Sequence, residues 1–255
     1  MTDPISAIFR IVATALLVAA TMLSAPLASA QTFSDDQRQQ IEGIIKDYLV
    51  KHPEVMQEVM TAVEKHQQEA DAEKQRATIR DNNATLFNSP HQVVLGNPKG
   101  NVTMVEFFDY NCAFCKRAMT DMMTLLKADP DLKFVLKEFP VLGEGSVEAA
   151  HVAVAARMQD ASGEKYIEFH QKLLGGRGEA NQARALAVAK EVGFDMARLQ
   201  KDMASDEAKQ TIDENLKLAD ALGVSGTPSY VVGTQLVVGA VGLDALKDKI
   251  NDARK

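Results

Sequence analysis

The spacing of apolar residues changes along the chain, and each change predicts a different kind of element. Between residues 33 and 80, apolar positions recur every three or four residues on a polar background, which is typical of amphipathic helices. Ser34 begins a capping box, and Pro53 suits the first turn of a second helix, where no backbone N–H is needed. The apolar stripe of this second helix consists of Val55, Val59 and Val63.

That stripe is too thin to bury a core, so it fits either a solvated helix or a helix that self-associates. Residues 81–90 are rich in turn-forming residues and predict a boundary. Beyond it, residues 102–108 and 131–139 are β-branched and aromatic, which predicts buried strands. We expect a helix between them at residues 112–127, and the order strand–helix–strand predicts a parallel pair.

The carboxy-terminal half begins with helical patterns and ends with a hairpin. The amphipathic segments from residue 146 to about residue 222 all have helical spacing. Apolar runs at 229–232 and 235–239 flank a Gly-Thr pair of hairpin-turn length, and a last helix is expected at 242–253. The pattern therefore predicts an α/β fold in which a helical insertion, at about 145–222, separates two halves of one sheet.

The first thirty residues have the organisation of a secretory signal peptide. Arg10 precedes an apolar run at 11–23, and Ala28 and Ala30 form a cleavage site. The run is shorter than the ~20 residues that a membrane span needs, so a retained anchor is the weaker alternative. Export would bring the mature protein to a place where disulfides persist. The net charge of −7 argues against a nucleic-acid partner, which would need a basic surface.

The two cysteines of the chain, Cys112 and Cys115, are separated by two residues. A structural disulfide would close a very small loop and so stabilise the fold weakly. A structural zinc site needs four ligands, and the sequence offers neither further cysteines nor zinc-type histidine spacing. Two thiolates could still bind Cu(I), which accepts soft ligands at low coordination number. A redox pair is the third interpretation.

The redox interpretation depends on where the pair lies in the fold. Cys112 follows the predicted strand and should lie in the first turn of the predicted helix at 112–127. Unpaired N–H groups and the helix dipole favour a thiolate there, which lowers a thiol pKa to roughly 3.5–7.5. Cys115, one turn further along, should be more deeply buried and should resolve a mixed disulfide.

Three segments together resemble a known family. Thr227-Pro228 comes directly before a strand, where an X–Pro bond can be cis, although an ordinary trans turn is the alternative. With VEFFDYNCAFC and the helical insertion, GVSGTPSYVVG makes residues 91–253 resemble the DsbA-type thiol–disulfide oxidoreductases of the thioredoxin superfamily. PEVMQEV and the segment from LFNSPHQVVLG to the cysteines are similar to the branch containing the copper-sensitivity suppressor ScsC. In that branch, amino-terminal helices resemble an oligomerisation arm, and trimers with isomerase activity occur.

The resemblance implies a role for each matching residue. Cys112 matches the nucleophile and Cys115 the resolving cysteine, while Thr227 and Pro228 match the cis-proline dipeptide that faces the disulfide. Glu106 matches an acidic residue in the strand beneath the motif, where a carboxylate can shuttle a proton to the buried thiol. Its spacing alone also fits a strand residue that faces solvent.

The chain departs from DsbA between its cysteines, where Ala113 and Phe114 replace proline and histidine. Without the histidine, the Cys112 thiolate loses one source of stabilisation, so we expect a weaker oxidant than DsbA.

These observations predict a signal peptide at 1–30, a helical oligomerisation arm at 31–90 and a thioredoxin-like domain at 91–255. The expected protein is a periplasmic oxidoreductase or isomerase that acts on secreted proteins without a cofactor and is reset by a membrane redox partner. It should be a homo-oligomer, a trimer by resemblance, formed through residues 33–80. A copper-binding protein that uses the same cysteine pair is the main alternative, and a secreted interaction module is another.

Overall fold

The computed structural model describes residues 33–160 and 162–255 of the chain. The predicted signal peptide at residues 1–30 lies outside the described residues. The chain divides into two compact units, Met1–Lys65 and His66–Lys255. Among the described helices, none is both long enough and apolar enough to cross a membrane.

The second unit is built on a five-stranded mixed sheet with the strand order β1-β3-β2-β4-β5. The central strands β2 (Val102–Phe108) and β3 (Leu132–Glu138) run parallel, joined by helix α5 (Ala113–Ala128), so the predicted βαβ unit is confirmed. The predicted hairpin is also present, as β4 (Ser229–Val232) and β5 (Gln235–Val238), and β4 pairs antiparallel with β2. Strand β1 (Val93–Gly96), which the sequence pattern did not predict, pairs antiparallel with β3.

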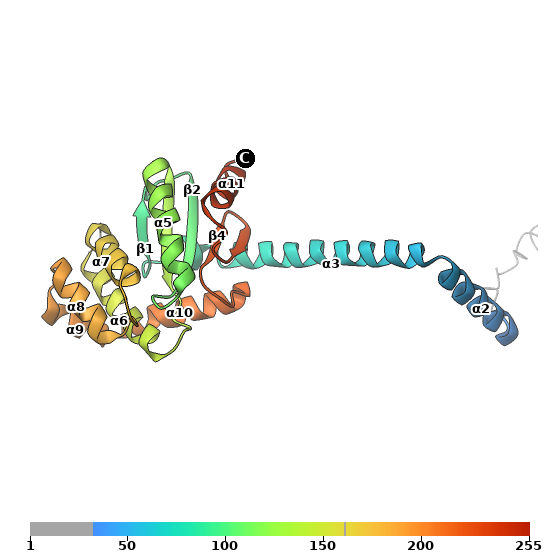
Figure 1. Cartoon of the computed structure of the whole chain (residues 1–255), viewed down its shortest axis with the longest axis horizontal. Helices are drawn as coiled ribbons and strands as arrows, with labels where there is room; N and C mark the ends of the chain where they lie inside the picture. The colour runs from blue at the N-terminus through green and yellow to red at the C-terminus, as the bar shows by residue number, and fades with distance from the viewer. Residues whose placement is uncertain (1–32, 161) are drawn as a thin grey trace, which may run out of the picture. The chain divides into compact units, whose positions relative to one another are not determined.

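A run of helices separates the two halves of the sheet, as predicted. Their bounds are α6 Glu144–Gln159, α7 Glu164–Gly175, α8 Gln182–Val192, α9 Met196–Met203 and α10 Asp206–Leu222, and α11 (Leu243–Ala253) ends the chain. Figure 1 shows α6, α7, α8 and α9 gathered at one side of the sheet. The α/β class with a helical insertion is therefore confirmed.

Side chains of β2 alternate between two cores, because successive residues of a strand point to opposite faces of a sheet. Met104 and Phe108 belong to a core shared with α5 and the inserted helices. Val105 and Phe107 belong to a second core, which includes residues of α10. By the same alternation, Glu106 lies on the face of Met104 and Phe108, beneath α5.

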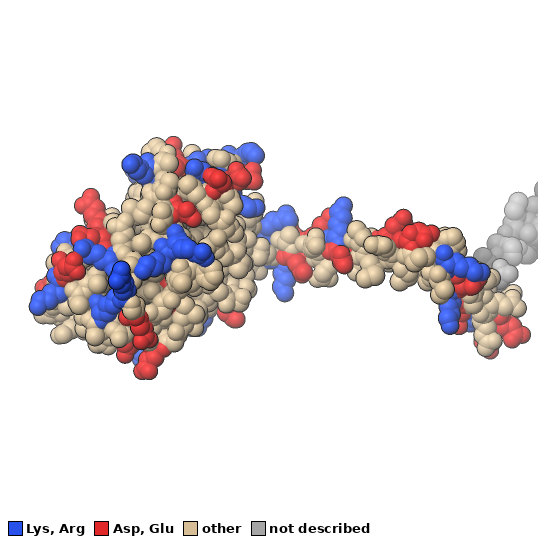
Figure 2. Space-filling view, in the orientation of Figure 1, with Lys and Arg blue, Asp and Glu red and all other residues tan. Residues whose placement is uncertain are grey.

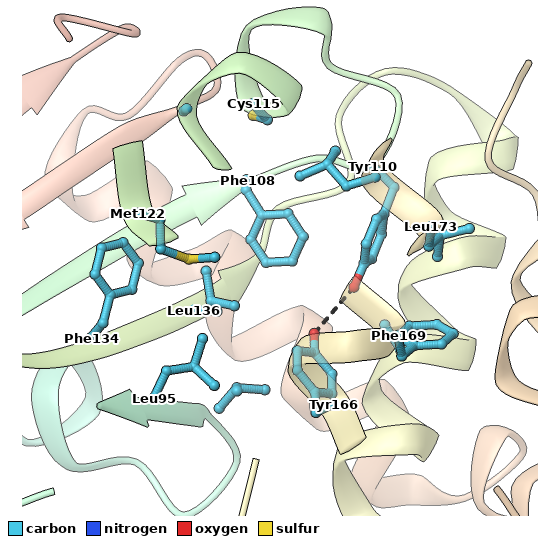
Figure 3. Close-up of a cluster of buried hydrophobic side chains, with 14 of the residues drawn as sticks. Leu95, Phe108, Tyr110, Cys115, Met122, Phe134, Leu136, Tyr166, Phe169 and Leu173 are labelled. Carbon is cyan, nitrogen blue, oxygen red and sulfur yellow. Dashed lines mark hydrogen bonds between the residues drawn. The ribbon is translucent and has the colours of Figure 1, made fainter. Parts of the chain in front are cut away.

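Buried hydrogen bonds join the inserted helices to the sheet. The hydroxyl of Tyr166 in α7 donates to Glu138 Oε1 of β3 at 2.6 Å, and it lies 3.2 Å from the hydroxyl of Tyr110 (Figure 3). His170 Nδ1 lies 3.3 Å from the same Tyr110 oxygen. Burial raises the pKa of Glu138 well above its usual range and lowers the pKa of His170 to about 3. The His170 ring is therefore neutral near pH 7, and burial favours the neutral form of Glu138.

The first unit contains helix α2 (Asp35–Lys51) and the beginning of α3 (Pro53–Asp81). The predicted capping box is confirmed, because Ser34 Oγ accepts from the Gln37 N–H and the Gln37 side chain accepts from the Ser34 N–H. No residue of α2 is buried. The exposed apolar side chains of the two helices include Ile41, Ile44, Ile45, Tyr48, Met56, Val59, Met60 and Val63.

The end of α3 differs from its beginning. Ile79 is 1% exposed, and Leu86 of the short helix α4 (Asn83–Asn88) is fully buried, both in the second core. Lys137 of β3 donates from Nζ to the Thr85 carbonyl at 2.7 Å, which ties α4 to the sheet. The predicted boundary segment at 81–90 therefore contains a short helix, which packs into the second core. Ile79 is the one buried residue of α3, so the polar composition of the whole helix does not reveal that its end is buried.

This packing predicts a specific loss of stability. Leu86→Ala should lower the free energy of unfolding of the second unit by about 2–5 kcal/mol, because it empties a closed site in the core. Asn83→Ala, on the exposed side of the same helix, should change it by less than about 0.5 kcal/mol. Urea unfolding of both variants measures the difference. Equal and small losses would mean that α4 does not belong to this core.

Candidate active site

Strand β2 delivers the cysteine pair to the start of α5. Cys112 occupies the N-cap position rather than the first turn that the sequence predicted, because the helix begins at Ala113. Its Sγ accepts a hydrogen bond from the backbone N–H of Cys115 at 3.4 Å. A sulfur at this position therefore does what an oxygen does in an ordinary N-cap residue.

This environment favours the thiolate of Cys112. The pKa of Cys112 is lowered to about 5, chiefly by the hydrogen bond with the Cys115 side chain, with further hydrogen bonds from the Thr227 side chain and from the backbone N–H groups of Cys115 and Phe114. Burial opposes the shift. Because these hydrogen bonds outweigh burial, the reduced site holds a thiolate at neutral pH.

Cys115 has the opposite character. It is fully buried, whereas Cys112 retains 6% exposure, so the predicted order of burial is confirmed. The pKa of the Cys115 thiol is strongly raised, first by its hydrogen bond with Cys112 and then by burial and the charge of Glu106. Figure 3 shows Cys115 on α5, above the core that contains Phe108 and Met122. The two thiols are thus separated in acidity, one poised to react and the other held protonated.

Thr227 and Pro228 lie against the cysteine pair, although 115 residues separate Thr227 from Cys112. The Thr227–Pro228 peptide bond is cis. The carbonyl oxygen of Thr227 lies 3.2 Å from Cys112 Sγ, as the acceptor of the thiol form. Pro228 is buried directly before β4, where its missing N–H leaves no gap in the strand pairing.

Glu106 lies inside the protein, so its alternative placement as a solvent-facing strand residue is excluded. It is 3% exposed and pairs in register with Tyr230 of β4. Burial, together with the charges of Cys112 and Asp121, raises the pKa of Glu106 to about 8. A carboxyl group with a pKa near 8 can both accept and release a proton near neutral pH.

Asp109 shapes the loop before the cysteines and was missed by the sequence interpretation. Its Oδ2 accepts from the N–H groups of Val141 (2.8 Å) and Leu142 (3.0 Å). Its Oδ1 accepts from the Asn111 N–H and from the Ser146 hydroxyl, both at 2.7 Å. One carboxylate therefore connects the β2–α5 loop with the segment that leads into α6.

Asn111 continues this connection to the inserted helices. Its side chain accepts from the Ala180 N–H at 2.7 Å and donates to the Ala180 carbonyl at 2.9 Å. The polar residues in FDYNC, directly after a buried strand, were the available signal for Asp109 and Asn111. Apart from the bond between these two residues, their partners could not be read from the sequence, because they lie 32 or more residues away along the chain.

Metal-binding groups are sparse around the site. Among residues 33–160 and 162–255, no group of three or more histidine, cysteine, aspartate or glutamate side chains is arranged to hold a metal ion.

Comparison with family models matches two parts of the chain. Residues 103–251 match the DSBA-like thioredoxin domain. Residues 37–70 match the N-terminal domain of the copper resistance protein ScsC. The second match covers most of α2 and the first half of α3, which carry the exposed apolar side chains.

Solved structures show the same relationships. A thioredoxin-like oxidoreductase from Silicibacter pomeroyi DSS-3 is 48% identical, with a TM-score of 0.64, over 67% of this chain and 96% of its own. The thiol–disulfide exchange protein alpha-DsbA2 from Wolbachia pipientis is 29% identical, with a TM-score of 0.66, over 72% and 97%. Proteus mirabilis ScsC in a transitional conformation is 25% identical, with a TM-score of 0.63, over 89% and 99%.

The curated relatives include much longer proteins. The Na(+)/H(+) antiporter NhaA 1 of Salinispora arenicola is 28% identical over 162 residues, which are 63% of this chain and 24% of the antiporter. The chain thus spans about a quarter of the length of the antiporters that it matches. The DSBA-like model covers more than half of the chain and includes the cysteine pair, Glu106 and Thr227–Pro228. The chain therefore belongs to the DsbA-like thioredoxin family, and it carries an ScsC-type amino-terminal domain ahead of its thioredoxin fold.

Proposed function

We propose that this protein is a thiol–disulfide oxidoreductase of the periplasm, which acts on the disulfides of secreted proteins. The observation that carries the proposal is the separation in acidity of the cysteine pair. Cys112, at the N-cap of α5, has a pKa of about 5, whereas the pKa of the buried Cys115 is strongly raised. Only the thiolate is a good nucleophile, so attack starts at Cys112.

The reaction proceeds through a mixed disulfide. The Cys112 thiolate attacks one sulfur of a substrate disulfide, whose S–S bond breaks and whose other sulfur leaves as a thiolate. Cys115 then loses its proton and attacks the Cys112 sulfur, which releases the substrate reduced and leaves the protein pair oxidised. The reverse sequence oxidises a substrate. If a second substrate thiol resolves the intermediate instead, the substrate disulfide is isomerised.

We assign Glu106 as the group that accepts the proton of Cys115. Its charge contributes to the raised pKa of Cys115, so the two groups interact inside the protein. Its own pKa of about 8 leaves a fraction of the carboxylate available at neutral pH. Cys115 is fully buried, so a buried acceptor offers its proton a route that bulk water does not.

The amino-terminal helices supply the contact between copies of the chain in this proposal. Their apolar side chains are exposed in the single chain, and residues 37–70 match the ScsC N-terminal domain. Burial in a bundle of identical helices would stabilise each such side chain by roughly 1.5–3 kcal/mol. A homotrimer would hold several Cys112 sites around one substrate at high effective concentration. A membrane redox partner would reset the pair after each cycle.

Trapping of the intermediate tests the function. The Cys115→Ser variant should accumulate disulfide-linked adducts with a scrambled secreted protein, because nothing within the site resolves Cys112. The rate of adduct formation should be nearly constant above about pH 6 and should fall as the pH drops through 5, where the Cys112 thiolate becomes protonated. Non-reducing electrophoresis measures the accumulation of the adduct, with Cys112→Ser as the unreactive control. The copper-binding alternative would be favoured if the variant forms no adduct and one equivalent of Cu(I) protects both thiols of the wild-type protein.

Glu106→Gln should slow only the resolving step. Glutamine keeps the shape of the side chain but accepts no proton, so release from the mixed disulfide should fall by about 10²-fold or more. The attack by Cys112 should be no slower, because the carboxylate near its sulfur is removed. Rapid-quench single turnovers separate the two steps. In the matched variant Asp121→Asn, loss of a neighbouring charge should shift the pH midpoint of release downward. Equal slowing of both steps in Glu106→Gln would contradict the assignment.

Charge in the apolar stripe should dissociate the oligomer. The double substitution Val59→Glu and Val63→Glu places two carboxylates where the bundle would be dry, so the protein should become a monomer. Disulfide reduction should persist, whereas isomerase activity should fall. Light scattering and refolding of a scrambled substrate measure these effects, and Gln57→Glu with Gln68→Glu, on the opposite face of the same helix, provides the matched control. A wild-type protein that is already monomeric would refute the role of the arm.

A further inference from the structure

A basic pocket borders Cys112 on the side of the inserted helices. It has a volume of about 320 Å³ and lies between the start of α5 and the loop after α7. Cys112 and Tyr110 line it, together with the cationic side chains of Lys116, Arg177 and Arg184. We call these three side chains and the space between them the cationic pocket.

Two of the cations are held in place by backbone carbonyls. Lys116 Nζ donates to the Gly176 carbonyl at 2.8 Å. The Arg184 guanidinium donates to the carbonyls of Leu173 and Gly178, both at 2.6 Å. Glycine at position 176 leaves room for this conformation, because a Cβ atom there would overlap the guanidinium. Hydrogen bonds to neutral carbonyls orient these cations and leave their charge uncompensated.

Arg177 has no such restraint. Its side chain is exposed, and it makes no hydrogen bond or ion pair within residues 33–160 and 162–255. None of the ten residues that line the pocket is aspartate or glutamate, although the whole chain carries a net charge of −7. Figure 2 shows lysine and arginine side chains gathered on this face, over the region where α5 and α7 lie in Figure 1. Three uncompensated cations thus surround a space beside the reactive sulfur.

The positive charge is not needed to explain the thiolate. The hydrogen bonds that lower the pKa of Cys112 come from Cys115, Thr227 and Phe114. A pocket of this volume is at the small end of those that hold ligands of low molecular weight. Guanidinium groups are suited to bind carboxylates through paired hydrogen bonds.

We propose that the cationic pocket binds the carboxylates of a small disulfide or thiol, of about tripeptide size, while the sulfur of that molecule meets Cys112. The inference rests on the proposed exchange activity and adds the chemical class of a small redox partner. Since such a molecule could oxidise or reduce the pair directly, the site would have a route for resetting that does not require a protein.

The exchange is balanced in sulfur bonds and protons. The Cys112 thiolate attacks a small disulfide, whose S–S bond breaks, and the departing half leaves as a thiolate. Cys115 then attacks the Cys112 sulfur, displaces the second half as a thiolate and gives up its proton, which one departing thiolate takes. The second departing thiolate takes a proton from water. The protein pair is oxidised by two electrons, and the small disulfide is reduced to two thiols.

Competing disulfides test the charge preference. Rates of oxidation of the reduced protein are measured with oxidised glutathione, which carries carboxylates, and with neutral hydroxyethyl disulfide. Arg177→Gln should lower the ratio of the glutathione rate to the neutral rate about five-fold, the effect of one exposed ion pair. Arg177→Glu should lower it further. Lys190→Gln, an equal charge change on α8 outside the pocket, should leave the ratio as it is. An unchanged ratio in both Arg177 variants would overturn the proposal.

Binding without chemistry separates this inference from the proposed function. S-methylglutathione keeps both carboxylates and cannot exchange, so calorimetry with the oxidised protein should detect binding that Arg177→Glu weakens. If no disulfide reacts, the proposed function fails. The binding of S-methylglutathione still tests whether the cationic pocket binds carboxylates. Absence of binding overturns the proposal that the cationic pocket binds carboxylates, even where the exchange activity is present. A larger Arg177 effect on a disulfide-linked acidic peptide than on oxidised glutathione would also overturn it, in favour of a polypeptide ligand.

Discussion

The hydrogen bond from the Cys115 N–H to the Cys112 sulfur is the interaction around which the site is organised. It exists only if β2 ends and α5 begins within a few residues, so that the first free N–H groups of the helix point at the sulfur. Asp109 holds that short connection by accepting four hydrogen bonds. Because its donors come from the loop and from the segment leading into α6, the inserted helices take part in fixing the position of the thiolate.

Buried ionisable groups occupy the centre of the sheet, where they are costly unless they are paired or neutral. Glu106 and Glu138 have raised pKa values because of burial, and the pKa of Lys137 is lowered to about 8 for the same reason. Glu138 and Lys137 each have a hydrogen-bond partner, and they join the sheet to α7 and α4 respectively. Glu106 pairs with Tyr230 only through the strand backbone and adjoins the cysteines, so it is the member of this group that remains available for proton transfer.

Much of this could be predicted from local sequence. The β-branched run at 102–108, the cysteines after it and the proline before β4 each have a local physical signature, so the strands, the βαβ unit and the insertion were found. Strand β1 has only four residues, and its pairing with β3 is a contact between distant segments. The burial of Ile79, the partners of Asp109 and the gathering of Lys116, Arg177 and Arg184 also depend on tertiary contacts. Such contacts leave no periodic trace in one sequence.

The capping role of Cys112 has a consequence for the folding equilibrium. In the reduced protein a negatively charged sulfur satisfies the start of α5, whereas in the oxidised protein the same sulfur is neutral and bonded to Cys115. A cross-link between residues so close together restricts the unfolded chain very little. Oxidation therefore removes the charge that caps α5 and adds little restraint on the unfolded chain in exchange. Whatever conformational stability the chain regains on reduction becomes the thermodynamic drive with which it passes its disulfide to another protein.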